Sequence, residues 1–332
     1  MTAFVGRASG KVILFGEHAV VYGVPGVAAG IDRGALATAT VTGGLGSVLT
    51  LGGQRFTDGG EEDLARAFSA LLAIADPGVK LEVDARADIP PGGGLGCSAA
   101  LGVAVARAVE AASGGHGDVI GRVAARATAW EGVFHGNPSG IDTAAAIAGS
   151  FLWFERGIGT SLIASPSDVW IAIGYSGASA STKTMVEGIA RIKEKNPPLF
   201  EKFLEGVRSI SNNAKLAIDA GDAHALGKLM DMNQMLLAGV MLSTEPIEAM
   251  IASARQGGAF GAKLTGSGGG GSVIALGGMC PRGQQGSDAE VLAKRIAESW
   301  SAAGYPSFPT RICGSSSGRS DPRSGAPAEQ KN

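Results

Sequence analysis

Pro90-Pro91-Gly92-Gly93-Gly94-Leu95-Gly96-Cys97-Ser98-Ala99-Ala100 is the stretch from which the fold of this chain can be worked out. Two prolines stiffen the backbone before the glycines, and the alanine-rich run behind them predicts a helix over roughly 98–113. Glycine adopts positive φ without steric cost, so such a loop can turn several N–H groups toward one anion. The positive end of the helix points to the same place. The stretch favours a phosphate-binding loop; a plain glycine-rich helix entry is the alternative.

Length and composition narrow the class of protein. The chain has 332 residues, enough for two domains, and its 45% hydrophobic and 17% charged residues are typical of a globular protein. A net charge of −2 gives no indication of a basic nucleic-acid or membrane surface. Three widely spaced cysteines without a CxxC pair favour a reducing cytoplasm over a structural zinc site. With neither a signal-peptide layout nor an apolar run of membrane length, we expect a cytoplasmic protein.

The N-terminal segment carries an unusual set of polar residues. Residues 3–15 contain two strand-like runs separated by Ser9-Gly10, and the second run begins with Lys11. Glu17 and His18 follow directly after that apolar run. A surface lysine and a glutamate that caps a helix are the alternative interpretation.

Helical and strand periodicity predict the rest of the first half. The spacing predicts a hairpin over 35–51, helices over Glu61–Ala75 and about 118–134, and strands over Val79–Val83, 150–154 and 169–174.

A second chemistry-bearing segment runs from Glu131 to Thr143. Glu131 lies at the end of a predicted helix, Gly-Asn-Pro forces a turn, and Ser139 is typical of the N-cap of the next helix. Asp142 is either the acidic partner in a capping box or a second carboxylate that faces the same pocket as Glu131. His135 is interpreted as a structural histidine.

The second half is strongly helical and ends with a second glycine-rich segment. Helices are predicted around 186–192, 200–218, after Asp222 and from Thr244 to Gly257, and a capping box at Ser287–Glu290 opens the last one. The segment 262–276 predicts strand, glycine loop, strand. Its G-x-G-x-x-G spacing is not a dinucleotide site, because such a site needs a helix next. An edge strand over 308–312 precedes a tail, 314–332, without apolar periodicity.

These pieces together fit phosphoryl transfer. That chemistry needs phosphate-binding N–H groups, a metal and a cation to spread charge, and a group that orients or deprotonates the attacking hydroxyl. The loop 92–97 supplies the N–H groups, and Ser98 and Glu131 supply oxygen ligands for Mg²⁺. Lys11 supplies the cation and Asp142 the base. Neither a Walker motif nor the H-R-D and D-F-G motifs of protein kinases occur.

Three ordered segments resemble the three motifs of the GHMP small-molecule kinase superfamily: Lys11–Gly23, Pro91–Ala100 and Lys263–Ser272. The first of these and Glu131–Asp142 are most similar to the mevalonate kinase family. The resemblance implies an α+β, two-domain fold, with an N-terminal α/β domain over 1–165 that carries the glycine-rich phosphate loop. A ferredoxin-like C-terminal domain over 166–313 and the flexible tail 314–332 follow.

The resemblance also implies an activity: ATP- and Mg²⁺-dependent phosphorylation of the 5-hydroxyl of mevalonate. The alternatives are another GHMP kinase, acting on phosphomevalonate, homoserine or a sugar, and a non-catalytic nucleotide-binding relative. The expected partners are this small molecule and ATP, without nucleic acid or membrane, and with a homodimer allowed.

Residue roles carry over by position. Lys11 would lower the pKa of the attacking hydroxyl, Asp142 would act as base or orient it, and Ser98 and Glu131 would ligate Mg²⁺. Glu17, His18 and Thr182 would lie near mevalonate. The residues implied in ATP binding are Pro91, Gly92, Gly93, Gly94, Leu95, Gly96, Cys97, Ser98 and Ala99. Cys97 departs from the pattern, which usually has serine there, and a hydroxyl contact to phosphate would be lost if that position uses its side chain.

Overall fold

The computed structural model describes residues 2–75, 77–115, 117–135, 140–179 and 181–316. The chain forms two compact units, the first from residues 2–11 and 33–149 and the second from residues 12–32 and 150–316. Strands β1 (Ala3–Phe15) and β2 (Gly26–Thr42) therefore each supply residues to both units. The sequence-based boundary at 165/166 stays a prediction.

The first unit contains a mixed sheet in the order β4-β3-β5-β2. β2 pairs antiparallel with β5 (Lys80–Ala87), which runs parallel to β3 (Val48–Leu51). β3 in turn pairs antiparallel with β4 (Gln54–Thr57). The predicted hairpin over 35–51 is wrong, because β5 lies between the two strands expected to pair. Alternation of apolar residues marks a strand but does not name its partner.

β1 is one continuous strand, so the predicted break at Ser9-Gly10 is also wrong. β1 pairs with β2, and a Cβ added to Gly34 of β2 would lie 2.0 Å from the Ala8 carbonyl oxygen and 2.7 Å from the Gly10 nitrogen. Glycine here permits a close approach of two backbones rather than ending a strand.

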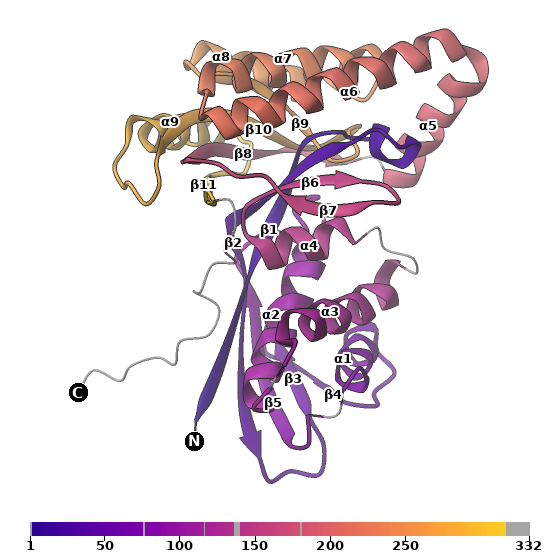
Figure 1. Cartoon of the computed structure of the whole chain (residues 1–332), viewed down its shortest axis with the longest axis vertical. Helices are drawn as coiled ribbons and strands as arrows, with labels where there is room; N and C mark the ends of the chain where they lie inside the picture. Colours follow the sequence, from indigo (N-terminus) through magenta and orange to yellow (C-terminus); the bar gives the residue numbers. More distant parts are fainter. Residues whose placement is uncertain (1, 76, 116, 136–139, 180, 317–332) are drawn as a thin grey trace. The chain divides into compact units, whose positions relative to one another are not determined.

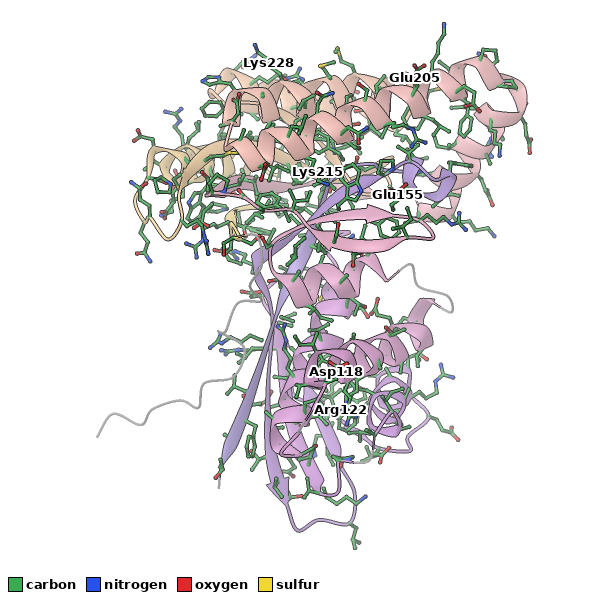
Figure 2. All side chains as sticks on the ribbon, viewed as in Figure 1. Asp118, Arg122, Glu155, Glu205, Lys215 and Lys228 are labelled. Atoms are coloured by element: carbon green, nitrogen blue, oxygen red, sulfur yellow. The ribbon has the colours of Figure 1, made fainter. Side chains whose placement is uncertain are left out.

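Four helices belong to the first unit: α1 (Asp63–Ala73), α2 (Cys97–Ala112), α3 (Val119–His135) and α4 (Ile141–Ala148). The helices predicted over Glu61–Ala75, 98–113 and 118–134 are confirmed. α2 lies against β5 and is buried over most of its length, while α3 packs on both α1 and α2 (Figure 1). At the start of α3 the Asp118 carboxylate accepts a hydrogen bond from the Gly121 N–H at 2.8 Å, and both Asp118 and Arg122 are labelled in Figure 2.

The second unit holds two sets of paired strands. The first half of β2 pairs with β6 (Phe151–Glu155), which pairs with β7 (Gly159–Leu162). A separate antiparallel sheet has the order β11 (Ser307–Ile312), β8 (Ser167–Ser179), β10 (Gly270–Pro281), β9 (Ala262–Thr265). The second glycine segment is followed by strand β10, so the rejection of a dinucleotide site is confirmed, as is the edge strand at the C-terminal end.

The helical elements of the second unit are the short 3₁₀ turn η1 (Ala19–Tyr22), α5 (Thr182–Lys195), α6 (Pro197–Ala220), α7 (Ala223–Gly239), α8 (Glu245–Gln256) and α9 (Asp288–Ala302). Of these, α7, α8 and α9 contact the second sheet. α9 packs on β8 and β10, and Figure 1 shows α6 and α7 running side by side. The predicted capping box is confirmed, because the Ser287 hydroxyl accepts from the Glu290 N–H at 3.2 Å.

The chain remains packed just beyond β11. The Gly314 N–H donates to Asp168 at 2.8 Å, and the Ser165 N–H donates to the Ser315 carbonyl at 2.9 Å. The rest of the predicted tail, 317–332, lies outside the described residues. Within the described part of the chain, no helix combines the length and the apolar character needed to cross a membrane.

Candidate active site

The glycine loop before α2 has the backbone conformation that an anion site requires. Gly92, Gly94 and Gly96 have φ of 76°, 74° and 70°, a left-handed region that favours glycine. Gly96 is the N-cap of α2, and no side chain caps that helix. The N–H groups of its first turn are therefore available to an anion such as a phosphate.

Lys11 is held against this loop. Its own N–H donates to the Leu95 carbonyl at 2.8 Å, and its Nζ donates to the Gly94 carbonyl at 3.3 Å. A Cβ on Gly96 would lie 3.3 Å from the Lys11 Cβ, so glycine at 96 also makes room for the lysine. Lys11 is only 8% exposed, which rules out the alternative of a surface lysine.

Asp142 meets the same ammonium group. Its Oδ1 lies 2.9 Å from the Lys11 Nζ, and its side chain is 38% exposed. α4, which carries Asp142 in its first turn, begins after an N-cap at Gly140 with φ 78° and no side-chain cap. The N-cap predicted at Ser139 is therefore wrong, and Ser139 itself lies outside the described residues. The structure thus pairs Asp142 with Lys11, and its catalytic role stays a prediction.

Ser98 and Glu131 form a second pair in the first unit. The Ser98 hydroxyl donates to the Glu131 Oε1 at 2.5 Å, and the glutamate is 3% exposed. The contact depends on the close packing of α2 and α3, because a Cβ on Gly102 would lie 2.7 Å from the Trp130 ring. Gly102 stands one helical turn after Ser98, so the same face of α2 brings the hydroxyl to the carboxylate.

This pair fits a magnesium ion. Mg²⁺ prefers oxygen ligands and is usually bound by one or two carboxylates together with substrate phosphates, rather than by a protein cage. A hydroxyl and a buried carboxylate within hydrogen-bond distance are such a partial site. Among the described residues, no group of three or more His, Cys, Asp or Glu side chains could hold a metal ion.

Cys97 opens α2 beside Ser98. Burial, and secondarily the negative charge of Asp88, raise the pKa of the Cys97 thiol. The neutral thiol is a weak hydrogen-bond donor, so the side chain offers a phosphate less than serine would. The backbone N–H of this first helical residue is unaffected by the exchange.

Two of the three predicted substrate residues, His18 and Thr182, meet at Ser267 in the second unit. The His18 Nε2 is 2.7 Å from the Ser267 carbonyl oxygen, and the Thr182 hydroxyl is 3.4 Å from the Ser267 hydroxyl. Because a carbonyl only accepts, Nε2 carries the proton, and Nδ1 of the neutral ring is left as an acceptor. Burial lowers the pKa of His18, although the Ser267 carbonyl and Glu17 oppose this, which favours the neutral ring.

Glu17 has a different environment. Its carboxylate, in a residue only 3% exposed, forms an ion pair with Lys263 and accepts a hydrogen bond from the Asn233 amide at 3.1 Å. The interpretation of Glu17 as a helix cap is wrong, because the N-cap of η1 is His18. Sequence reasoning missed Asn233, and it assigned Lys263 only to a motif. The available signal was a lysine between two apolar residues, Ala262 and Leu264, in a segment predicted as a strand.

The other candidate in this region is His135, the last residue of α3, whose side chain lies outside what the structure describes.

The first unit thus combines a buried ammonium, a carboxylate, a set of backbone donors and a hydrogen-bonded serine–glutamate pair. An ammonium lowers the pKa of a hydroxyl beside it, a carboxylate can accept the hydroxyl proton, and backbone N–H groups stabilise charge on a transferring phosphoryl group.

Two protein-family models match the chain. One, described as the GHMP kinases N terminal domain, matches residues 62–150, and the other, described as GHMP kinases C terminal, matches residues 214–307.

Individual proteins are also similar. The mevalonate kinase of Methanothermobacter thermautotrophicus is 36% identical over 288 residues, covering 82% of this chain and 89% of that protein. The mevalonate kinase of Pyrococcus abyssi is 33% identical over 306 residues, covering 81% and 87%. A crystal structure of L. major mevalonate kinase in complex with R-mevalonate superposes with a TM-score of 0.78 at 25% identity, covering 96% of this chain and 97% of that one. The α+β, two-domain architecture implied by the sequence is confirmed.

Proposed function

The chain belongs to the GHMP kinase family, and from that premise we propose that it is a mevalonate kinase, which transfers the γ-phosphoryl group of ATP to the 5-hydroxyl of mevalonate. The products are 5-phosphomevalonate and ADP. The observation that carries the proposal is the Lys11–Asp142 ion pair at 2.9 Å, with the Lys11 Nζ also 3.3 Å from the phosphate loop at Gly94. The names of the relatives supply the acceptor.

Lys11 and Asp142 act on the attacking hydroxyl. The Lys11 ammonium stabilises negative charge as it develops on the hydroxyl oxygen, and the Asp142 carboxylate accepts or orients the hydroxyl proton. As the new bond between oxygen and phosphorus forms, the bond from phosphorus to the bridging oxygen of ADP breaks, and the proton leaves the hydroxyl. The 38% exposure of Asp142 gives the released proton a path to solvent.

The loop from Pro91 to Ala99 binds the phosphates of ATP through its N–H groups and the start of α2. Ser98 and Glu131 would hold Mg²⁺ when the nucleotide is bound, and the ion would supply positive charge to neutralise the phosphate oxygens. Both ligands are fixed by their mutual hydrogen bond and by the Gly102–Trp130 packing.

His18 and Thr182 bind mevalonate in this proposal. The Nδ1 of neutral His18 accepts a hydrogen bond, and Thr182 offers a hydroxyl. A non-catalytic relative is disfavoured, because the ammonium, the carboxylate and the metal-ligating pair are all in place.

A reducing cytoplasm remains part of the proposal, since the structure holds Cys97, Cys280 and Cys313 as thiols. A homodimer also remains part of it.

A coupled ADP-release assay with Mg-ATP tests the function. The acceptor panel is mevalonate, phosphomevalonate, homoserine and galactose, each with an ATP-only control for hydrolysis. We expect ADP release with mevalonate alone. Release confined to another acceptor would overturn the substrate assignment but not the phosphoryl-transfer chemistry, and no release with any acceptor would contradict the kinase proposal.

A further inference from the structure

A fully buried ion pair lies in the second unit and has no role in the chemistry described above. Lys263, in β9, is 0% exposed, and its Nζ contacts the Glu17 carboxylate and donates to the Leu264 carbonyl at 2.6 Å. Burying two charges carries a large desolvation penalty, which close geometry and further hydrogen bonds must offset. A pair kept despite that penalty points to a positional role.

Asn233 of α7 strengthens this interpretation. Its amide donates to the second carboxylate oxygen of Glu17, and the residue is 0% exposed. The Asn233 Oδ1 has no hydrogen-bond partner among the described residues, an arrangement that lowers stability. The Asn233 amide nitrogen thus hydrogen-bonds to Glu17, while the amide oxygen of the same side chain has no hydrogen-bond partner among the described residues. Both oxygens of the Glu17 carboxylate are engaged by buried donors, so Glu17 is directed toward the protein interior.

His18, which follows Glu17 in the chain, has a backbone conformation that few residues adopt. His18 has φ 60°, a left-handed conformation that is uncommon outside glycine and needs support from its surroundings. Its ring contacts Ser267, in the glycine segment that follows β9. Close by, the Thr265 hydroxyl donates to the Ile13 carbonyl at 2.8 Å and accepts from the Ile13 N–H at 3.1 Å. The segments 13–18 and 263–267 therefore contact each other through three residue pairs: Ile13 with Thr265, Glu17 with Lys263, and His18 with Ser267.

We propose that Lys263 is a positioning residue for mevalonate binding: through its buried ion pair with Glu17, it holds His18 in its strained conformation with Nδ1 available to the substrate. Glu17 then acts on Lys263 and Asn233, and not on mevalonate itself. The proposal rests on the proposed function for the identity of the substrate.

The two members of the pair respond differently to loss of a partner. Burial lowers the pKa of Lys263, and the Glu17 charge opposes that shift. In Glu17→Gln the lysine can therefore release its proton and remain buried as a neutral amine. In Lys263→Met the carboxylate keeps only the Asn233 amide as a partner, so this variant should be the more severe.

A double-mutant cycle tests the proposal with Lys263→Met, Glu17→Gln and the double variant, in which methionine and glutamine keep the length of both side chains. We expect Lys263→Met to raise KM for mevalonate and to lower kcat/KM by about 100-fold, the loss that a displacement of about 1 Å can cause. KM for ATP should stay within about twofold, because the ATP loop is not touched. The double variant should have a KM for mevalonate no higher than Lys263→Met, since both changes break one interaction.

Independent effects would overturn the proposal. If Glu17 contacts mevalonate, the two increases in KM multiply in the double variant. Unchanged KM for mevalonate in both single variants, or equal increases in KM for ATP, would also contradict it. Lys294→Met is the matched control, because Lys294 is an exposed lysine that pairs with Glu290 in the same unit, at 2.6 Å, and its loss should leave both KM values unchanged.

Asn233→Leu keeps the test decisive if Lys263→Met does not fold. Asn233 is placed to touch Glu17 and not the substrate, so a raised KM for mevalonate supports the proposal and an unchanged one contradicts it. Wild-type turnover is measured first. No turnover of mevalonate by the wild type would overturn the proposed function, while thermal melting of the same cycle would still show whether Lys263 and Glu17 are coupled.

Discussion

The variant Asp142→Asn tests whether the Asp142 carboxylate contributes to catalysis or only to stability. At 2.9 Å, two unit charges interact by about 6 kcal/mol at an effective dielectric constant of about 20. Because Asp142 is 38% exposed, solvent screening reduces the contribution of the pair to stability to about 1 kcal/mol or less. A general base contributes about 10²–10⁴-fold to rate, which is about 3–5 kcal/mol of transition-state stabilisation. We therefore expect a large loss of kcat with almost unchanged stability.

The assay is steady-state ADP release at saturating mevalonate and Mg-ATP, with urea unfolding of the same preparation and ATP binding by calorimetry. Asp118→Asn is the matched control: the same substitution in the same unit, at an exposed helix cap that asparagine also satisfies (Figure 2). A fall in kcat of less than about tenfold in Asp142→Asn would refute the assigned role. So would a loss of stability large enough to account for the lost activity.

Three further predictions concern other residues. Glu131→Gln should raise the Mg²⁺ concentration for half-maximal rate by about tenfold or more, and an unaltered Mg²⁺ titration would remove Glu131 from the metal site. The pKa of His18 is lower in the folded protein than in the unfolded chain, so as the pH falls the unfolded chain takes up this proton at a higher pH than the folded protein does. The contribution of neutral His18 to the free energy of unfolding is therefore complete above about pH 6.5 and decreases below it. Melting between pH 7.5 and 5.5 should therefore show a smaller decline in His18→Gln than in the wild type, and equal declines would contradict this. Arg126 is 1% exposed and donates to Glu110 at 2.6 Å and to the Leu71 and Ala75 carbonyls. Arg126→Met should therefore lower the free energy of unfolding, measured by urea titration, by about 3–5 kcal/mol. A loss below about 1 kcal/mol would show that stability does not depend on this buried ion pair.

The sequence predicted the helices well and the strand pairings poorly. α6 and α9 are recognisable because their apolar residues repeat at helical spacing and their caps are local in sequence. The second half of β2 pairs with β5, which follows only after two other strands and a helix, and nothing in the spacing of 35–51 indicates that. Gly10 and Gly34 were ambiguous for a related reason, because a glycine that ends a strand and one that admits a neighbouring backbone look alike in sequence.

In the candidate site too, features that are local in sequence could be predicted and contacts between distant residues could not. Local patterns indicated the glycine loop at 92–97, Lys11 and Asp142 as candidates, and the structure adds the contact between Lys11 and Asp142. The environment of Glu17 could not be predicted, because its partners, Lys263 and Asn233, are more than 200 residues away along the chain. Whether a glutamate faces substrate or a buried lysine depends on that distant pairing alone.

The way β1 and β2 divide between the two units sets an order of events on the ribosome. The first unit has all its described residues once residue 149 has emerged, whereas segment 12–32 must wait for partners that extend to β11. At about 5–20 residues per second, that delay is about 10–30 s. During it Val12, Phe15 and Ile31, fully buried in the finished protein, have no completed core to enter. Nascent chains paused between residues 149 and 312 should therefore be the ones that recruit chaperones most strongly.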